Sequence, residues 1–356
     1  MRLLFASTCW IALVFIAGGC APDETRIEPS DRWPETGSQN YVTEPVPLAD
    51  RSEGMSYGLP KAGLPSIQDL IDVLPESDVG FDDPKFFSSN AQPLSCSNGR
   101  TTQTASLPMT VEGVVTIPGT YYIKVSVCDQ EEKFYGSYVI EDDTGGIMVL
   151  RDSRVAQVQP GDVVRMTVHT IAISDNLGRT DSRGVLSYEL EILPEKKDVL
   201  YSRTQSPLTT DDVGRTLQVE GYAIELPTNL NFSTMVLSDK EFPATDASGS
   251  SVCQNYCQPA CATACVGAGT SDVCQTRICP TLCAEYDAEN VDGGDPTAFL
   301  ANRLPTCWVV GLNQELLRRG YNFADANKLR ATGPVLRDYS SFTVTVEKLG
   351  QIEILE

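Results

Sequence analysis

The feature that most constrains this fold is a group of closely spaced cysteines in the second half of the chain. Seven of the 12 cysteines fall within residues 253–283, with the spacing C-x3-C-x3-C-x3-C-x8-C-x4-C-x3-C. A three-residue gap places successive thiols at i and i+4, on one face of a helix. The spacing therefore predicts a small helical hairpin stapled by disulfide bonds. We expect its helices to start near Pro259 and Pro280, because proline is tolerated in a first helical turn.

The first residues of the chain carry the pattern of an export signal. Arg2 precedes an uncharged apolar run that ends at Ala17, shorter than the roughly 20 residues that a bilayer-spanning helix needs. The sequence Ala17-Gly18-Gly19-Cys20 resembles the lipobox of bacterial lipoproteins. This resemblance implies that residues 1–19 are a signal peptide, removed on export, and that Cys20 becomes the lipidated N-terminus. Ordinary cleavage near Gly19, without a lipid, is the alternative.

The segment that follows Cys20 has the composition of a tether. Residues 20–63 contain several prolines and acidic residues and few large aliphatic side chains. Burial cannot offset the entropy lost when such a segment is ordered, so we expect it to be disordered. Lipoprotein sorting rules look for Asp directly after the cysteine as a retention signal, and Ala21 stands there instead. The resemblance therefore implies a lipid-anchored protein of the outer membrane or cell surface.

Ten cysteines remain once Cys9 leaves with the signal and Cys20 is lipidated. They are Cys96, Cys128, Cys253, Cys257, Cys261, Cys265, Cys274, Cys279, Cys283 and Cys307. An even number of cysteines in an exported chain predicts a disulfide framework. A thiolate metal cluster is the alternative, but the C-x2-C spacing of zinc ribbons is absent and an oxidising compartment disfavours free thiolates. The connectivity within 253–307 stays open.

Two series of strand-like segments flank this hairpin. From residue 108 to about residue 193, apolar runs and alternating stretches separated by turn residues predict five strands, as in a small Greek-key barrel. A similar series begins at Gln218-Val219-Glu220-Gly221-Tyr222, which resembles Thr110-Val111-Glu112-Gly113-Val114. The expected fold is all-β, with two five-stranded barrels in tandem over residues 64–200 and 201–356. The cysteine-rich segment, 250–298, would be an insertion between the second and third strands of the second barrel.

The first series resembles a known family. The segments Val111-Glu112-Gly113-Val114-Val115, Ile140-Glu141-Asp142-Asp143-Thr144-Gly145-Gly146-Ile147 and Gly161-Asp162-Val163 look like those of the uncharacterised OB-fold domain found in bacterial surface lipoproteins. The resemblance covers residues 66–195 and begins with a short helix at Ser66-Ile67-Gln68-Asp69-Leu70-Ile71. It implies that the first barrel is an OB-fold, and the similar strand pattern predicts an OB-fold-like second barrel. The second series lacks the Asp-Asp-Thr-Gly-Gly turn, so its assignment depends on the strand pattern alone.

An aromatic hairpin in the first barrel is the candidate ligand face. OB-folds bind extended ligands on their second and third strands. The residues on these strands that we expect to form the face are Tyr122, Lys124, Phe134 and Tyr135. Packing of individual rings inside the barrel is the alternative.

Charge and composition argue against several functions. With 27 Lys and Arg against 48 Asp and Glu, the net charge is -21, which disfavours binding to nucleic acid. The single histidine, His169, excludes a multi-histidine metal site within one chain and is expected to be an exposed strand residue rather than a catalytic one. We therefore expect no catalytic residue, no metal and no cofactor. The acidic loop 287–295, with Asp287, Glu289, Asp292 and Asp295, could hold calcium but is also typical of a solvated linker.

These features predict a surface-anchored lipoprotein that is not an enzyme and acts as a binding or scaffold module. Its partners would be the membrane, through the lipid, and a protein or glycan outside the cell or in the periplasm. Two alternatives stay open: an accessory subunit or hydrolase with an unrecognised site, and an OB-fold protein that binds single-stranded nucleic acid. Polar titratable side chains converging in one pocket would favour the first alternative. A local basic groove would favour the second.

We predict a disulfide bond between Cys96 and Cys128. The eight other mature cysteines after Cys20 can pair among themselves, which leaves these two for each other. The bond would close a loop of about 30 residues and stabilise the fold by roughly 3–4 kcal/mol in the chain-entropy treatment. Peptide mapping without reduction should recover the two cysteines in one linked pair of peptides. A peptide that joins either of them to the 253–307 set would contradict the prediction.

Overall fold

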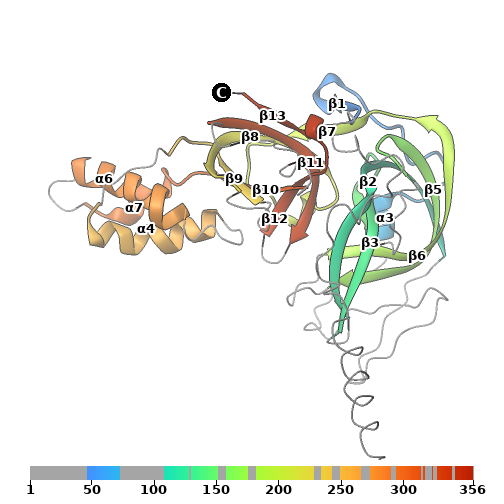
Figure 1. Ribbon diagram of the computed structural model, residues 1–356, viewed down its shortest axis with the longest axis horizontal. Coiled ribbons are helices and arrows are strands. Elements are labelled where there is room, and N and C mark those ends of the chain that lie inside the picture. The colour runs from blue at the N-terminus through green and yellow to red at the C-terminus, as the bar shows by residue number, and fades with distance from the viewer. Residues whose placement is uncertain are drawn as a thin grey trace, which may run out of the picture.

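The computed structural model describes residues 46–72, 108–127, 130–150, 158–174, 182–227, 234–242, 249–265, 273–289, 294–313, 316, 323, 327–338 and 341–355. Two β-modules lie side by side, and a helical arm extends from the second module on the side remote from the first (Figure 1). Within the described ranges, no helix is long and apolar enough to cross a bilayer. Cys20, Cys96 and Cys128 lie outside them.

The first β-module is a closed five-stranded barrel. Its strands are β2 (Met109–Val127), β3 (Gln130–Glu141), β4 (Gly146–Val149), β5 (Asp162–Ser174) and β6 (Ser182–Lys196). They are joined in the order β2-β3-β4-β6-β5, and β5 pairs with β2 to close the ring. The pairing of β4 with β6 is parallel and the others are antiparallel. The predicted barrel over this part of the chain is therefore confirmed.

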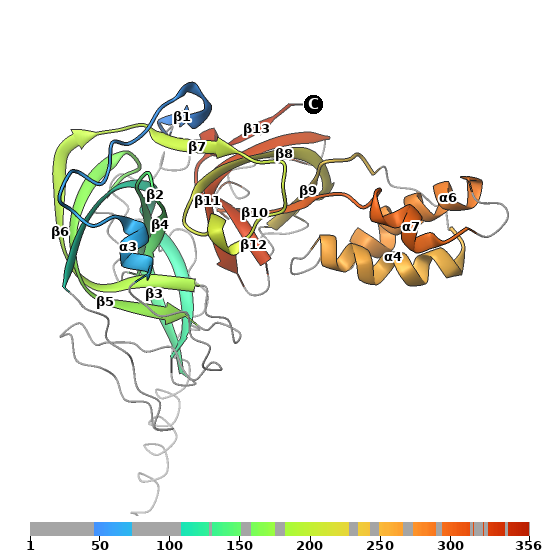
Figure 2. The ribbon, with the colours of Figure 1, turned by 180° about the vertical axis from the view of Figure 1, so that it is seen from behind.

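A short helix fills part of the core of this barrel. Helix α3 (Ile67–Asp72) packs its fully buried Ile67 and Leu70 against strand residues such as Val111 and Ile140. Figure 2 shows α3 beside the strands of the barrel. Ser66 caps the helix by accepting a bond from the Asp69 N–H, and Asp69 accepts one from the Ser66 N–H in return. This capping box explains why the helix starts where the sequence predicts it.

The structure differs from the predicted tether at its end. The sequence predicts disorder up to residue 63, but residues 46–63 pack onto the modules, with strand β1 (Leu48–Asp50) and the 3-10 helix η2 (Arg51–Glu53). Tyr57 and Leu59 are buried against the first barrel, in a cluster with Val114 and Val163. These few apolar side chains, together with partners far away in the sequence, outweigh a composition that is otherwise typical of disorder.

The second β-module is built on an eight-stranded sheet. Its remaining strands are β7 (Val199–Arg203), β8 (Thr216–Glu225), β9 (Thr234–Ser238), β10 (Cys307–Leu312), β11 (Lys328–Asp338), β12 (Ser341–Val346) and β13 (Ile352–Ile354). The order is β1-β7-β8-β9-β10-β12-β11-β13, and β8 also pairs with β11. β1 pairs with β7 in parallel, so the sheet includes the segment that precedes the first barrel. The 3-10 helices η3 (Thr210–Asp212) and η5 (Leu349–Gln351) lie before β8 and before β13.

The helical arm interrupts the second module between β9 and β10, as the sequence predicts. It contains α4 (Ser251–Ala264), a π-helical turn η4 (Cys274–Ile278), α6 (Cys279–Glu289) and α7 (Pro296–Ala301). Its core combines the buried cysteines of the arm with apolar side chains, including Ile278, Leu282 and Leu300, and extends onto Ile224 of β8 and Val236 of β9. A helical segment this small has little apolar core of its own, so covalent links must supply part of its stability.

We predict that Leu70→Ala destabilises the first β-module by about 2–5 kcal/mol, because it removes a fully buried side chain of α3 from the core of the barrel. Denaturant unfolding followed by circular dichroism would measure the change. Gln68→Ala, on the exposed side of the same helix, is the matched control and should change stability by less than about 0.5 kcal/mol. Equal effects of the two substitutions would show that α3 is not part of the barrel core.

Candidate functional site

The turn between β3 and β4 brings three carboxylates together, and each binds a different part of the chain. Asp142 is fully buried. Its Oδ1 accepts the N–H groups of Thr144 at 2.7 Å and Gly145 at 2.9 Å, which closes the turn. Its Oδ2 accepts the N–H of Ile67 at 2.8 Å, at the start of α3. Asp142 therefore holds helix α3 against the barrel.

Asp143 binds the segment that precedes α3. Its Oδ1 accepts the Tyr57 N–H at 2.7 Å and its Oδ2 accepts the Leu59 N–H at 3.2 Å. The guanidinium of Arg51 also donates to Oδ1, at 3.2 Å, and lies 4.7 Å from the centre of the Tyr57 ring. The Tyr57 hydroxyl accepts the N–H of Leu200 at 2.8 Å, which brings in β7. Asp143 is thus the acceptor that orders residues 51–59.

Glu141 lies where the two β-modules meet. Its side chain is 1% exposed, and Oε1 accepts a charged hydrogen bond from Arg51 at 2.8 Å. Oε2 accepts the N–H of Thr216, the first residue of β8, at 3.0 Å. Burial raises the pKa of Glu141 from its ordinary value of 4.5 to about 7, although the charge of Arg51 and the bonds from Thr216 act in the opposite direction. Glu141 is therefore a titratable group at the contact between the two β-modules.

The backbone around this turn is in close contact with the second module. A Cβ atom on Gly146 would lie 2.0 Å from the carbonyl oxygen of Gly214, so only glycine fits there. The side chain of Arg215 donates to the carbonyl of Thr144. Residues 141–146, which we call the acidic turn, thus have their polar groups engaged within the molecule. The geometry supports a structural role for the turn, which joins the two modules, rather than a role in binding a ligand.

The candidate ligand face lies on the expected strands. β2 and β3 are neighbours, with Tyr122 opposite Tyr135, Ile123 opposite Phe134 and Lys124 opposite Lys133. The side chains of Tyr122, Lys124, Phe134 and Tyr135 lie outside the described part of the structure. The assignment of these residues to a ligand face stays a prediction.

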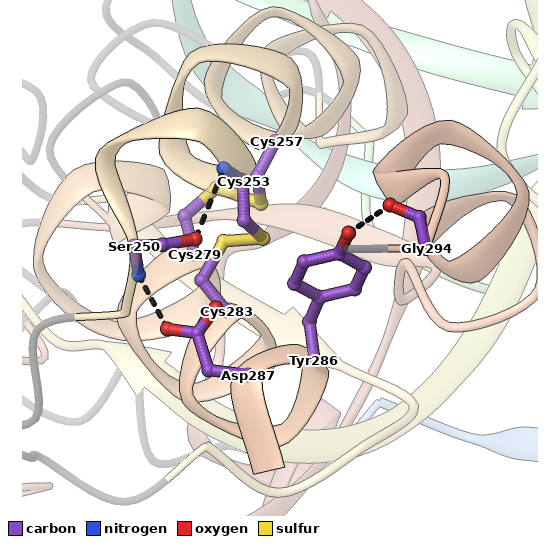
Figure 3. The surroundings of a disulfide bond; sticks show 8 residues. All are labelled: Ser250, Cys253, Cys257, Cys279, Cys283, Tyr286, Asp287 and Gly294. Carbon is purple, nitrogen blue, oxygen red and sulfur yellow. Dashed lines mark hydrogen bonds between the residues drawn. A yellow bond between two sulfur atoms is a disulfide. The ribbon is translucent and has the colours of Figure 1, made fainter. Parts of the chain in front are cut away.

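Four disulfide bonds staple the helical arm. The pairs are Cys253–Cys283, Cys257–Cys279, Cys261–Cys274 and Cys265–Cys307, with Cα atoms 4.8–5.8 Å apart. The eight cysteines between 253 and 307 therefore pair among themselves, as the sequence predicts. The first three bonds form a ladder between two antiparallel helices, and two of its rungs are drawn in Figure 3. The fourth links the end of α4 to β10, so the arm is covalently fixed to the sheet.

The π-helical turn explains an irregularity in the cysteine spacing. Cysteines on α4 follow one another every four residues, whereas Cys274 and Cys279 are five residues apart. In a regular α-helix the extra residue would rotate Cys274 away from α4. The segment Cys274–Ile278 forms a π turn in which the Cys279 N–H bonds to the Cys274 carbonyl, an i→i+5 bond. The wider turn absorbs the extra residue and keeps both thiols facing α4.

One expectation about the helix boundaries is wrong. The sequence predicts a helix start near each proline, and Pro280 indeed lies in the first turn of α6. Pro259, however, lies inside α4, which runs from Ser251 to Ala264. Its ring is on the exposed side of the helix, where water can bind the carbonyl that proline leaves without a donor. The disulfides at Cys257 and Cys261 hold the helix on either side of it.

The acidic loop is partly engaged with protein partners. Asp287 accepts the N–H of Ser250 at 2.6 Å, Glu289 pairs with Arg303 at 3.0 Å, and Asp295 caps α7 through the Thr297 N–H at 2.9 Å. Asp292 lies outside the described residues. Across the part of the chain that is described, no three His, Cys, Asp or Glu side chains come together in a way that could hold a metal ion. Calcium binding by this loop stays a prediction.

Comparison of the chain with models of known protein families, with curated proteins and with solved structures gives no match.

Sequence reasoning missed the residues that join the modules. Arg51 lies in the segment that the sequence predicts to be a tether, and Thr216 carries no sequence signal because its backbone N–H makes the contact. The sequence identifies the acidic turn as a family motif but carries no sign that it joins the two β-modules. One available signal was the pair of glycines at 145 and 146 directly after two aspartates, since adjacent glycines permit close approach of another backbone.

We predict that Glu141→Gln removes part of the pH dependence of stability. Because burial raises the pKa of Glu141 in the folded chain, the folded state binds the proton more tightly than the unfolded state. The stabilisation that this provides is complete below pH 4.5 and is lost as the pH rises through about 7. Between about pH 5 and about pH 8, wild type should therefore lose up to about 3 kcal/mol more unfolding free energy than the variant.

Urea unfolding at the two pH values would measure this difference. Glutamine keeps an acceptor for the Thr216 N–H but turns an amide NH2 toward the Arg51 donor, so the comparison uses the change in stability between the two pH values and not the absolute stability. Glu53→Gln, at an exposed position in η2, is the control and should behave as wild type. If Glu141→Gln and wild type lose the same stability as the pH rises, the Glu141 carboxyl group does not titrate in this range.

Proposed function

We propose that this chain is an exported lipoprotein, attached to the outer membrane through a lipid on Cys20. In this proposal it acts as a non-enzymatic binding or scaffold module, built on two OB-fold-like barrels and a disulfide-stapled arm. Its partner is a protein or glycan outside the cell or in the periplasm. The observation that carries the proposal is the helical arm, a rigid element that extends away from both β-modules (Figure 1).

The disulfides support export. Four bonds connect eight cysteines in the arm. Such a density of disulfides is typical of oxidising compartments outside the cytosol. It agrees with an apolar leader that ends in Ala17-Gly18-Gly19-Cys20.

The strand pairings support two barrels of one kind. The first module pairs in the order β2-β3-β4-β6-β5 and closes between β5 and β2. In the second module β8-β9-β10-β12-β11 follow the same order, and β11 pairs with β8. The parallel pair also corresponds, β4 with β6 and β10 with β12. Five-stranded barrels of this kind often present one strand face to an extended ligand.

The arm supports a role in binding. Its bonds restrict the helices before any partner arrives, so little conformational freedom is lost on association. The bond between Cys265 and Cys307 also fixes its base to β10. A rigid projection on a stable β-scaffold suits the presentation of a surface to another molecule.

We predict that the mature chain begins at a lipid-modified Cys20. Mass spectrometry of the N-terminal peptide should show a diacylglycerol group on the thiol, and Cys20→Ser should shift the protein from the membrane fraction to the soluble fraction. Several acyl chains, at about 0.8 kcal/mol for each buried methylene, are sufficient for stable attachment. Ser30→Ala, in the same N-terminal segment of the mature chain, should leave the fractionation unchanged. An unmodified Cys20 in the membrane fraction would contradict the lipid anchor.

A capture experiment on intact cell envelopes would test the binding function. The wild-type chain should retain a defined protein or glycan, and the double variant Tyr122→Ser with Tyr135→Ser should lose it if the candidate ligand face is used. Retention by both forms would place the contact elsewhere on the molecule. Catalytic turnover of a substrate by the purified chain would contradict the non-enzymatic role.

A further inference from the structure

The outer face of α4 exposes large side chains without any charge. Val252 is 58% exposed and Tyr256 is 51% exposed. Pro259 and Thr263 are also exposed. These four residues stand at i, i+4, i+7 and i+11, so they share one face of the helix. We call this set the α4 face.

The opposite side of α4 is covalently fixed. Its cysteines at 253, 257, 261 and 265 are buried, and each forms a disulfide bond. The helix backbone under the α4 face is therefore already rigid before any contact forms. Association still costs translational and rotational freedom, but no backbone needs to be ordered, which lowers the cost of binding.

Electrostatics indicate what can cover this face. The whole of α4, with the sequence SVCQNYCQPACATA, contains no Asp, Glu, Lys or Arg, although the chain carries a net charge of -21. Two copies of so acidic a chain repel each other wherever charged surfaces meet. The α4 face allows two copies to approach without setting like charges against each other, and interface centres are typically depleted of charge and enriched in tyrosine.

We propose that α4 pairs with α4 of a second copy of this chain, antiparallel and across a twofold axis. An isologous contact requires a surface that matches itself. In the antiparallel register centred between 257 and 258, Tyr256 of one copy meets Pro259 of the other, and Val252 meets Thr263. Asn255 flanks the α4 face, and its exposed amide, which can both donate and accept, can form hydrogen bonds across the axis.

The size of the contact sets its strength. A helix of 14 residues is about 21 Å long, and one face of it buries well under the roughly 800 Å² per partner of a standard interface. The pair is therefore weak in solution, as is typical of contacts below the standard size. Two copies anchored in one membrane would be concentrated enough to pair. That last consequence depends on the proposed lipid anchor, whereas the helix pairing itself does not.

Sedimentation equilibrium on residues 20–356 with Cys20→Ser, disulfides intact, tests the pairing without any lipid. We expect a monomer–dimer equilibrium between about 0.01 and about 1 mM that strengthens in high salt, because salt screens the repulsion between acidic copies. Val252→Glu with Tyr256→Glu should weaken it at least about tenfold, because each copy then brings two carboxylates into a contact that offers no cation to pair with them. Ile354→Glu, a change at another exposed apolar side chain, should have no effect. A monomer at all concentrations and salt levels overturns the proposal.

A second pair of variants keeps the test decisive if the double substitution disturbs the arm. Tyr256→Glu and Tyr256→Lys copies, each mixed with itself, should associate less than wild type, whereas the mixture of the two should recover association. Recovery in the mixture supports contact between the two α4 helices. Dimers that respond to neither set of variants overturn the proposal, and they would do so whether or not Cys20 carries a lipid.

Discussion

Three successive carboxylates in the acidic turn hold the parts of this molecule together. A buried carboxylate is costly unless donors reach it, and here the donors come from distant segments: the start of α3 for Asp142, residues 51–59 for Asp143, and both Arg51 and the start of β8 for Glu141. The same groups thus close the turn, hold α3 against the barrel, order the end of the N-terminal segment and attach the second module. Loss of a donor to Glu141 or Asp142, which are buried, would leave a carboxylate without its partner, which explains why so many elements depend on one short turn.

The helical arm is stabilised in a different way. It has a small core in which cystines make up about half of the buried residues, and three of its four disulfides form a ladder between α4 and the helix opposite. The fourth disulfide ties the arm to β10 and so to the sheet of the second module. The molecule therefore combines a scaffold joined by hydrogen bonds with an arm held by covalent bonds, and the arm can present a surface that contributes little to the stability of the scaffold.

Local patterns in the sequence predicted the local structure well. Cysteine spacing indicated the helical hairpin, and alternation indicated the first barrel and the place of the arm between β9 and β10. Two features could not be found in this way. Residues 46–63 are held in an ordered conformation by contacts such as that of Arg51 with Glu141, which lies 90 residues away in the sequence. Composition alone carries no information on such partners. Pro259 inside α4 is tolerated because neighbouring disulfides hold the helix, so a rule for isolated helices failed there. The candidate ligand face stays a prediction from strand position.

Calorimetric unfolding of Gly146→Ala tests the central claim most directly, namely that the acidic turn joins the two β-modules into one cooperative unit. The added Cβ would lie 2.0 Å from the Gly214 carbonyl oxygen, so the two backbones must separate, while the barrel strands themselves need not change. The account predicts a single transition for the wild-type β-modules and two resolved transitions for the variant. Two transitions in the wild type, or one unchanged transition in both proteins, would contradict it.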